Sequence, residues 1–133
     1  MQAIYFDKGG ASDVLRYGDV DTPLHCSDKQ VLVRIKAAGI NPMDCKMRAA
    51  PDRFPVTFPV IPGCDGAGIV EAVGLQVQNF KPGDAVYFSQ PGFNQRQGTY
   101  AEYVLVDAGL LAKKPLSLSF EQAAAAPLIL ITA

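Results

Sequence analysis

The 133 residues include 12 Lys and Arg against 13 Asp and Glu, for a net charge of −1, and 49% of them are hydrophobic. This length and composition predict one domain with its own core, and they exclude a surface basic enough to bind nucleic acid. Three cysteines without a disulfide pattern and a start without a signal peptide predict a cytoplasmic protein, and no stretch reaches the roughly 18 apolar residues of a membrane span.

The first 117 residues have the pattern of short strands separated by turns. The clearest strand is 30–39, where Arg34 and Lys36 alternate with apolar residues, as expected for a strand with one buried face. Many of the 10 prolines and 12 glycines lie between such segments. The fold is therefore predicted to be mainly β, a barrel or a sandwich, with strands at 2–6, 14–20, 30–39, 67–74, 84–88 and 100–106.

Helical patterns occur at 43–49 and again from Ser119. Ser119 and Gln122 have the spacing of a capping box, in which each side chain accepts a backbone N–H of the other residue. Pro127 either ends this helix or lies in the first turn of a second one. The segment 47–59 carries Phe54 and Phe58 among prolines, which indicates a flap over a cleft or, as we favour, aromatic packing against the strands.

Five segments, in this order along the chain, carry a pattern typical of one protein superfamily. They are 39–44 (GINPMD), 62–74 (PGCDGAGIVEAVG), 80–86 (FKPGDAV), 98–104 (GTYAEYV) and 119–132 (SFEQAAAAPLILIT). Together they resemble the medium-chain dehydrogenase/reductase superfamily. The resemblance implies a GroES-like β-barrel with short helices that holds the substrate, followed by a Rossmann domain that binds NAD(P)H.

The resemblance divides the chain into two parts. Residues 1–117 would form the barrel, and 118–133 would be the helical start of the connection to a Rossmann domain that this chain lacks. The last seven residues form an apolar run, which a domain would normally bury. We therefore expect the chain to be truncated before the Rossmann domain and to belong to a longer protein.

The glycine-rich segment 63–68 has a second interpretation, as a phosphate-binding loop. Its spacing is GxxGxG, and the residues after it have the pattern of a strand, whereas a phosphate loop needs a helix there. We favour glycines that permit tight turns and close approach between strands.

The resemblance also bears on metal binding. Zinc-dependent members place a Cys where this chain has Asn41, and a His-Glu pair where it has Cys64 and Asp65. The chain therefore looks like the zinc-independent quinone oxidoreductase (ζ-crystallin-like) branch, for which no zinc is expected. Two less favoured alternatives remain. In one, Cys64, Asp65, Cys45 and Asp44 converge on a metal, and in the other the protein is a zinc-type alcohol dehydrogenase with divergent ligands. We interpret His25 as a surface residue.

The same resemblance implies where the site lies. Asn41 and Asp44 are the candidate catalytic residues, and Asn41, Cys64 and Thr132 are the candidate cofactor contacts. Each also has a structural interpretation. Asn41 would be a turn residue and Asp44 a charge at a helix N-terminus. Cys64 would be a small buried side chain, and Thr132 a threonine inside a helix. Tyr100, within 98–104, is predicted to be a core or cross-strand aromatic.

The whole enzyme would reduce a quinone or an α,β-unsaturated carbonyl compound with NADH or NADPH, and it is expected to be a homo-oligomer. The chain alone, without a pyrophosphate site, is expected to be inactive. A different class of function remains open, in which the chain is a self-standing GroES-like barrel used for binding or assembly.

Overall fold

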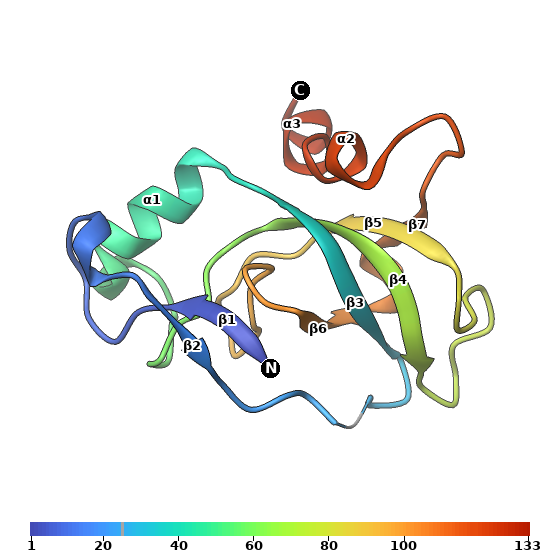
Figure 1. Cartoon of the computed structure of the whole chain (residues 1–133), viewed down its shortest axis with the longest axis horizontal. Coiled ribbons are helices and arrows are strands. Elements are labelled where there is room, and N and C mark those ends of the chain that lie inside the picture. Colours follow the sequence, from blue (N-terminus) through green and yellow to red (C-terminus); the bar gives the residue numbers. More distant parts are fainter. Residues whose placement is uncertain (25) are drawn as a thin grey trace.

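The computed structural model describes residues 1–24 and 26–133. His25 lies outside the described residues, so its predicted surface position stays a prediction. Two antiparallel sheets and three short α-helices make up the described part of the chain (Figure 1). One sheet pairs β1 (Gln2–Tyr5) with β2 (Arg16–Asp19). The other has the order β6-β3-β4-β5-β7, with β3 (Gln30–Gly39), β4 (Asp65–Val73), β5 (Ala85–Ser89), β6 (Tyr103–Asp107) and β7 (Leu111–Lys113).

The larger sheet encloses the main hydrophobic core. Val31 and Val33 on β3 are fully buried, while Arg34 points outward and pairs with Glu71 at 3.5 Å. This confirms the alternation predicted for 30–39. Valines of β4, β5 and β6 complete the core together with Phe88 and Leu111.

The larger sheet must curl into a barrel because of its connections. Strands β6 and β7 lie at opposite edges of the strand order. Only the short 3₁₀ turn Ala108–Leu110 joins them along the chain. The two edges therefore come close together, as in a barrel and not in a sandwich.

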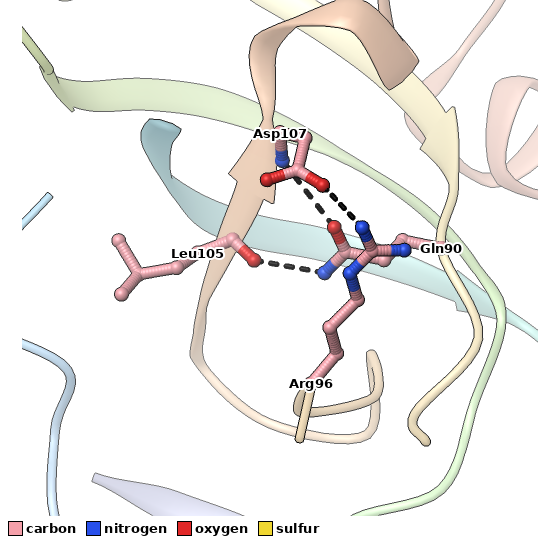
Figure 2. Close-up of polar contacts among 4 residues, drawn as sticks. All are labelled: Gln90, Arg96, Leu105 and Asp107. Carbon is pink, nitrogen blue, oxygen red and sulfur yellow. Dashed lines mark hydrogen bonds and ion pairs between the residues drawn. The ribbon is translucent and has the colours of Figure 1, made fainter. Parts of the chain in front are cut away.

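The buried side chain of Gln90 hydrogen-bonds the free edge of β6, and Figure 2 shows these contacts. The side-chain amide of Gln90 donates to the carbonyl of Leu105 at 2.8 Å and accepts the N–H of Asp107 at 3.3 Å. Arg96 in turn pairs with the Asp107 carboxylate. Backbone groups that β3 does not reach are thus satisfied by a side chain where a further strand would otherwise be needed.

The helices lie outside the barrel. Helix α1 (Pro42–Ala49) follows β3, while α2 (Phe120–Ala124) and α3 (Pro127–Thr132) lie together on one side of the sheet (Figure 1). The capping box of Ser119 and Gln122 is confirmed, with hydrogen bonds of 2.9 and 3.1 Å. Pro127 lies in the first turn of α3, which decides between its two predicted positions. Small residues, Ala123 and Ala124, let α2 pack closely on the sheet.

Some predicted elements have different limits. Residues 100–106 do not form one strand: Ala101 makes an isolated bridge to Ala3 of β1, and only Tyr103–Asp107 pair along β3. Predicted strand 14–20 is a 3₁₀ turn, Ser12–Val14, followed by β2, and β7 was not predicted. Phe58 packs edge-on against Phe6 at 6.2 Å between ring centroids, in agreement with aromatic packing of 47–59. None of the helices within residues 1–24 and 26–133 has the length and apolar character to cross a membrane.

Candidate functional site

The site begins where β3 passes into α1. Asn41 is the N-cap of α1, with the extended backbone (φ −124°, ψ 154°) that a cap requires. Pro42 follows at the first helical position, where its missing N–H costs no hydrogen bond. The Asp44 carboxylate accepts the backbone N–H of Asn41 at 2.8 Å. Both predicted catalytic residues therefore stabilise the start of α1.

Asp44 is the centre of a buried polar cluster. It is only 4% exposed. The Tyr100 hydroxyl donates to its Oδ2 at 2.9 Å, and the Cys64 thiol lies 3.5 Å from its Oδ1. Three segments that are distant in sequence thus converge on one carboxylate.

A second buried carboxylate, Asp65, lies on the other side of Asn41. Asp65 is the first residue of β4 and is 1% exposed. Its Oδ2 accepts the side-chain Nδ2–H of Asn41 at 3.0 Å, and both oxygens lie 3.1 Å from the N–H of Leu128 in α3. Asn41 therefore connects the two carboxylates, one through its backbone and one through its side chain.

Within the described part of the chain, the groups that hydrogen-bond these carboxylates are neutral donors. Among residues 1–24 and 26–133 three ion pairs occur, and none includes Asp44 or Asp65. Burial, and then the charge and hydrogen bond of Asp44, raises the pKa of Cys64 to about 12. The same causes raise the pKa of Tyr100 above its ordinary value. The thiol and the phenol therefore remain protonated at neutral pH and act as donors.

Two hollows flank the cluster. One, of about 490 Å³, is lined by 37–41, Asp65 and residues of α2 and α3. The other, of about 190 Å³, is lined by Asp44, Arg48 and Tyr100, among others. Ile40 borders both hollows and is 80% exposed. A larger hollow of about 530 Å³ lies between 57–61 and 92–97, and no residue of the cluster lines it. A third hollow, of about 450 Å³, reaches the cluster only at Tyr100. The two flanking hollows are therefore the places where a small molecule would meet Asn41, Asp44 and Asp65.

The structure brings together three of the four predicted site residues. Asn41, Asp44 and Cys64 form one connected cluster. Thr132 does not join it, because its hydroxyl donates to the Leu128 carbonyl at 2.8 Å within α3. The catalytic and cofactor roles of all four residues stay predictions.

Two members of the cluster were not predicted in these roles. Tyr100 was expected to be a core or cross-strand aromatic; it is half-buried in a bend outside the strands, and its hydroxyl donates to Asp44. Asp65 was considered only as a possible metal ligand. The motif 98–104 was the available signal for Tyr100, but it was used only for the family resemblance and for the strand 100–106.

The described residues do not fit a zinc site. Within 1–24 and 26–133 no group of three or more His, Cys, Asp or Glu side chains is placed to hold a metal ion. Cys45 is exposed, and Asp65 is occupied by Asn41 and Leu128. Of the four residues proposed to converge, only Cys64 and Asp44 meet.

The glycine-rich segment 63–68 is a close-packing element. Gly63 has φ +104°, and a Cβ there would collide with the Thr99 hydroxyl. A Cβ at Gly68 would collide with the carbonyl of Arg34 on β3. The segment continues directly as β4, and no helix follows to receive a pyrophosphate. The phosphate-loop interpretation is therefore wrong, and the packing interpretation is confirmed.

Comparisons with known proteins agree with this fold. Residues 27–116 match the family model described as "Alcohol dehydrogenase GroES-like domain". The chain is 39% identical over 140 residues to 2-methylene-furan-3-one reductase of Solanum lycopersicum, covering all of this chain and 36% of that protein.

Solved structures give the same picture. Escherichia coli quinone oxidoreductase, complexed with NADPH, superimposes with a TM-score of 0.88 at 34% identity over 99% of this chain and 39% of that one. A protein from Rhizobium etli CFN 42, described as a putative zinc-dependent alcohol dehydrogenase, gives a TM-score of 0.89 at 38% identity, covering 99% of this chain and 38% of that one. The chain spans 36 to 38% of the length of the first curated relatives it matches. The predicted mainly-β, GroES-like fold is confirmed.

Proposed function

Because this chain belongs to the alcohol dehydrogenase GroES-like domain family, we propose that it forms the substrate-side part of a longer NAD(P)H-dependent oxidoreductase. The proposed substrates are quinones and α,β-unsaturated carbonyl compounds. The observation that carries the proposal is the buried cluster of Asn41, Asp44, Cys64 and Tyr100 between two hollows. The names of the tomato reductase and the Escherichia coli quinone oxidoreductase support the substrate class.

No zinc-ligand set is present among the described residues, and this favours a hydride acceptor that is already activated by conjugation. Reduced nicotinamide, when bound, supplies a hydride to an electron-poor carbon of the substrate. In a quinone or an enone, conjugation already makes that carbon electrophilic, so orientation by hydrogen bonds is the main task of the protein. We therefore propose a zinc-independent reaction.

Each site residue has a proposed role in holding the reactants. Asn41, at the edge of the larger hollow, would hydrogen-bond the nicotinamide end of the cofactor through its remaining amide donor and acceptor sites. Asp44 would accept a hydrogen bond from the substrate or from a water on it. Cys64 would line the cleft as a neutral thiol, and Thr132 would contact the cofactor after its hydroxyl turns away from Leu128.

The remaining proposals concern the whole protein. Most of the cofactor would be bound by residues that the longer relatives possess outside the matched region, and either NADH or NADPH would serve. We propose that the complete enzyme is a cytoplasmic homo-oligomer and that the 133-residue chain alone does not turn over.

The test uses the complete product of the open reading frame that encodes this chain. We expect oxidation of NADPH or NADH, followed by absorbance, in the presence of a quinone or an enone. The matched saturated ketone should give no reaction, and metal analysis should find no stoichiometric zinc. Alcohol oxidation that requires bound zinc would instead establish the zinc-type alternative. An open reading frame that ends at Ala133, with a product that forms a defined oligomer, would establish the binding or assembly barrel.

A further inference from the structure

The buried carboxylate of Asp65 has no part in the proposed chemistry, yet it makes two bonds of different kinds. It is 1% exposed, and no ion pair within 1–24 and 26–133 includes it. It accepts the Asn41 side-chain amide at 3.0 Å and the N–H of Leu128 at 3.1 Å. Burying a carboxylate is costly unless hydrogen bonds compensate for the lost contacts with water. These two donors therefore help to make the burial of Asp65 possible.

The hydrogen bond between Asp65 and Asn41 determines the orientation of the Asn41 side-chain amide. An asparagine amide presents NH₂ donors at one end and an oxygen acceptor at the other. With Nδ2 directed at Asp65, the oxygen is directed away from that carboxylate. The reversed amide would place two acceptor oxygens against each other in a buried place, which is unfavourable. Asp65 therefore fixes the donor and acceptor pattern that Asn41 offers to the hollow of about 490 Å³.

The bond to Leu128 supplies the cap that α3 lacks. The N-cap residue of α3, Ala126, makes no side-chain cap bond, and Pro127 has no N–H. The Asp65 carboxylate reaches the next N–H from β4 and places a negative charge at the helix N-terminus, where it is favourable. A helix of six residues is not stable by itself, so this contact helps to hold α3 against the sheet.

We propose that Asp65 is a positioning residue that sets Asn41 and α3 relative to each other through one carboxylate. This rests on the proposed function, in which Asn41 and Thr132 of α3 both contact the nicotinamide end of the cofactor. Gly39, paired with Asp65 across β3 and β4, supports the arrangement. A Cβ at Gly39 would collide with the Ala124 carbonyl oxygen and would lie 3.0 Å from the Asp65 Cβ.

The first test uses the 133-residue chain and does not depend on activity. In Asp65→Asn, which preserves the size of the side chain, we expect the Leu128 amide to lose protection from hydrogen exchange. The Asn41 side-chain NH₂ resonances should shift in the same variant. The matched control is Asp84→Asn, which removes a carboxylate that accepts the backbone N–H of Lys81 at 3.0 Å in an exposed turn. The control should leave both signals unchanged.

A change at Leu128 with unchanged Asn41 resonances would overturn the proposal, because Asp65 would then be only a helix cap. Should Asp65→Asn fail to fold, Asn41→Ala examines the same link from the other side. The Leu128 amide resonance should shift in that variant, since the carboxylate loses its second donor. An unshifted resonance would likewise overturn the proposal.

The second test uses the complete enzyme. We expect Asp65→Asn to lower kcat roughly ten- to a hundredfold while KM for NADPH changes less than about threefold, because orientation is lost more than binding. In an Asn41→Ala background the same substitution should lower kcat no more than about twofold further, as for residues that act as a unit. Full additivity of the two effects would overturn the proposal. An inactive wild-type enzyme would instead refute the proposed function, and the resonances of Asn41 and Leu128 would still decide the role of Asp65.

Discussion

Replacing Tyr100 with phenylalanine tests the polar cluster, because it removes one oxygen atom and keeps the ring. The Tyr100 hydroxyl donates to Asp44 at 2.9 Å, in a half-buried position. A hydrogen bond to a charged group contributes about 1.5–3 kcal/mol. Asp44 retains the Asn41 N–H at 2.8 Å and the neighbouring Cys64 thiol, so it is not left without donors. We therefore expect the free energy of unfolding to fall by about 2 kcal/mol, within the range for such bonds.

The assay is equilibrium unfolding of the 133-residue chain in urea, followed by circular dichroism. With a slope of about 1–3 kcal/mol per molar urea, a loss of this size lowers the midpoint by roughly 1 M. Tyr103→Phe is the matched control, because none of the hydrogen bonds recorded for residues 1–24 and 26–133 involves the Tyr103 hydroxyl. The control should stay within about 0.5 kcal/mol of wild type. Equal stability of the two variants would refute the view that the bond to Asp44 stabilises the fold.

Three further predictions concern two buried polar side chains in or near the cluster. The Thr99 hydroxyl is buried without a hydrogen-bond partner among the described residues. Thr99→Val should therefore raise the free energy of unfolding, measured in urea, by about 1 kcal/mol. A loss of stability would instead indicate that the hydroxyl has a hydrogen-bond partner. Because the pKa of Cys64 is raised from 9.0 to about 12, iodoacetamide at neutral pH should label exposed Cys45 well before Cys64, as read by mass spectrometry. As the pH rises, the Cys64 thiol loses its proton in the unfolded state before it does so in the folded state, so the free energy of unfolding should fall between about pH 9 and 12. The fall should be smaller in Cys64→Ser. Equal dependence of stability on pH in the two proteins would contradict the raised pKa of Cys64.

The parts of the fold that follow from neighbouring residues were predictable from the sequence. The alternation around Arg34 and Lys36 places β3, because the side chains of a strand alternate between its two faces. The capping box at Ser119 joins residues only three apart. By contrast, β7 has three residues, too few to show a period. The division of 100–106 between two partner strands depends on β1 and β3, which lie far away in sequence.

The candidate site shows the same limit more sharply. Resemblance indicated Asn41, Asp44 and Cys64, and the structure brings these residues together. The bonds that organise them join positions 56 residues apart, for Tyr100 and Asp44, and 63 apart, for Leu128 and Asp65. No local pattern encodes such contacts, because they arise only when the barrel closes and the helices pack on it.

The glutamine on the free edge of β6 also has a consequence for how copies of the chain meet. An unpaired edge strand is a template for another chain, and this is a common route to aggregation. Here the Gln90 side chain hydrogen-bonds the Leu105 carbonyl and the Asp107 N–H, and Gln97 donates to the Tyr103 carbonyl at 2.6 Å. An incoming strand would have to displace the buried Gln90 and the half-buried Gln97 before it gained its first ladder hydrogen bond. The residues that complete the barrel thus also make this edge unfavourable for strand addition.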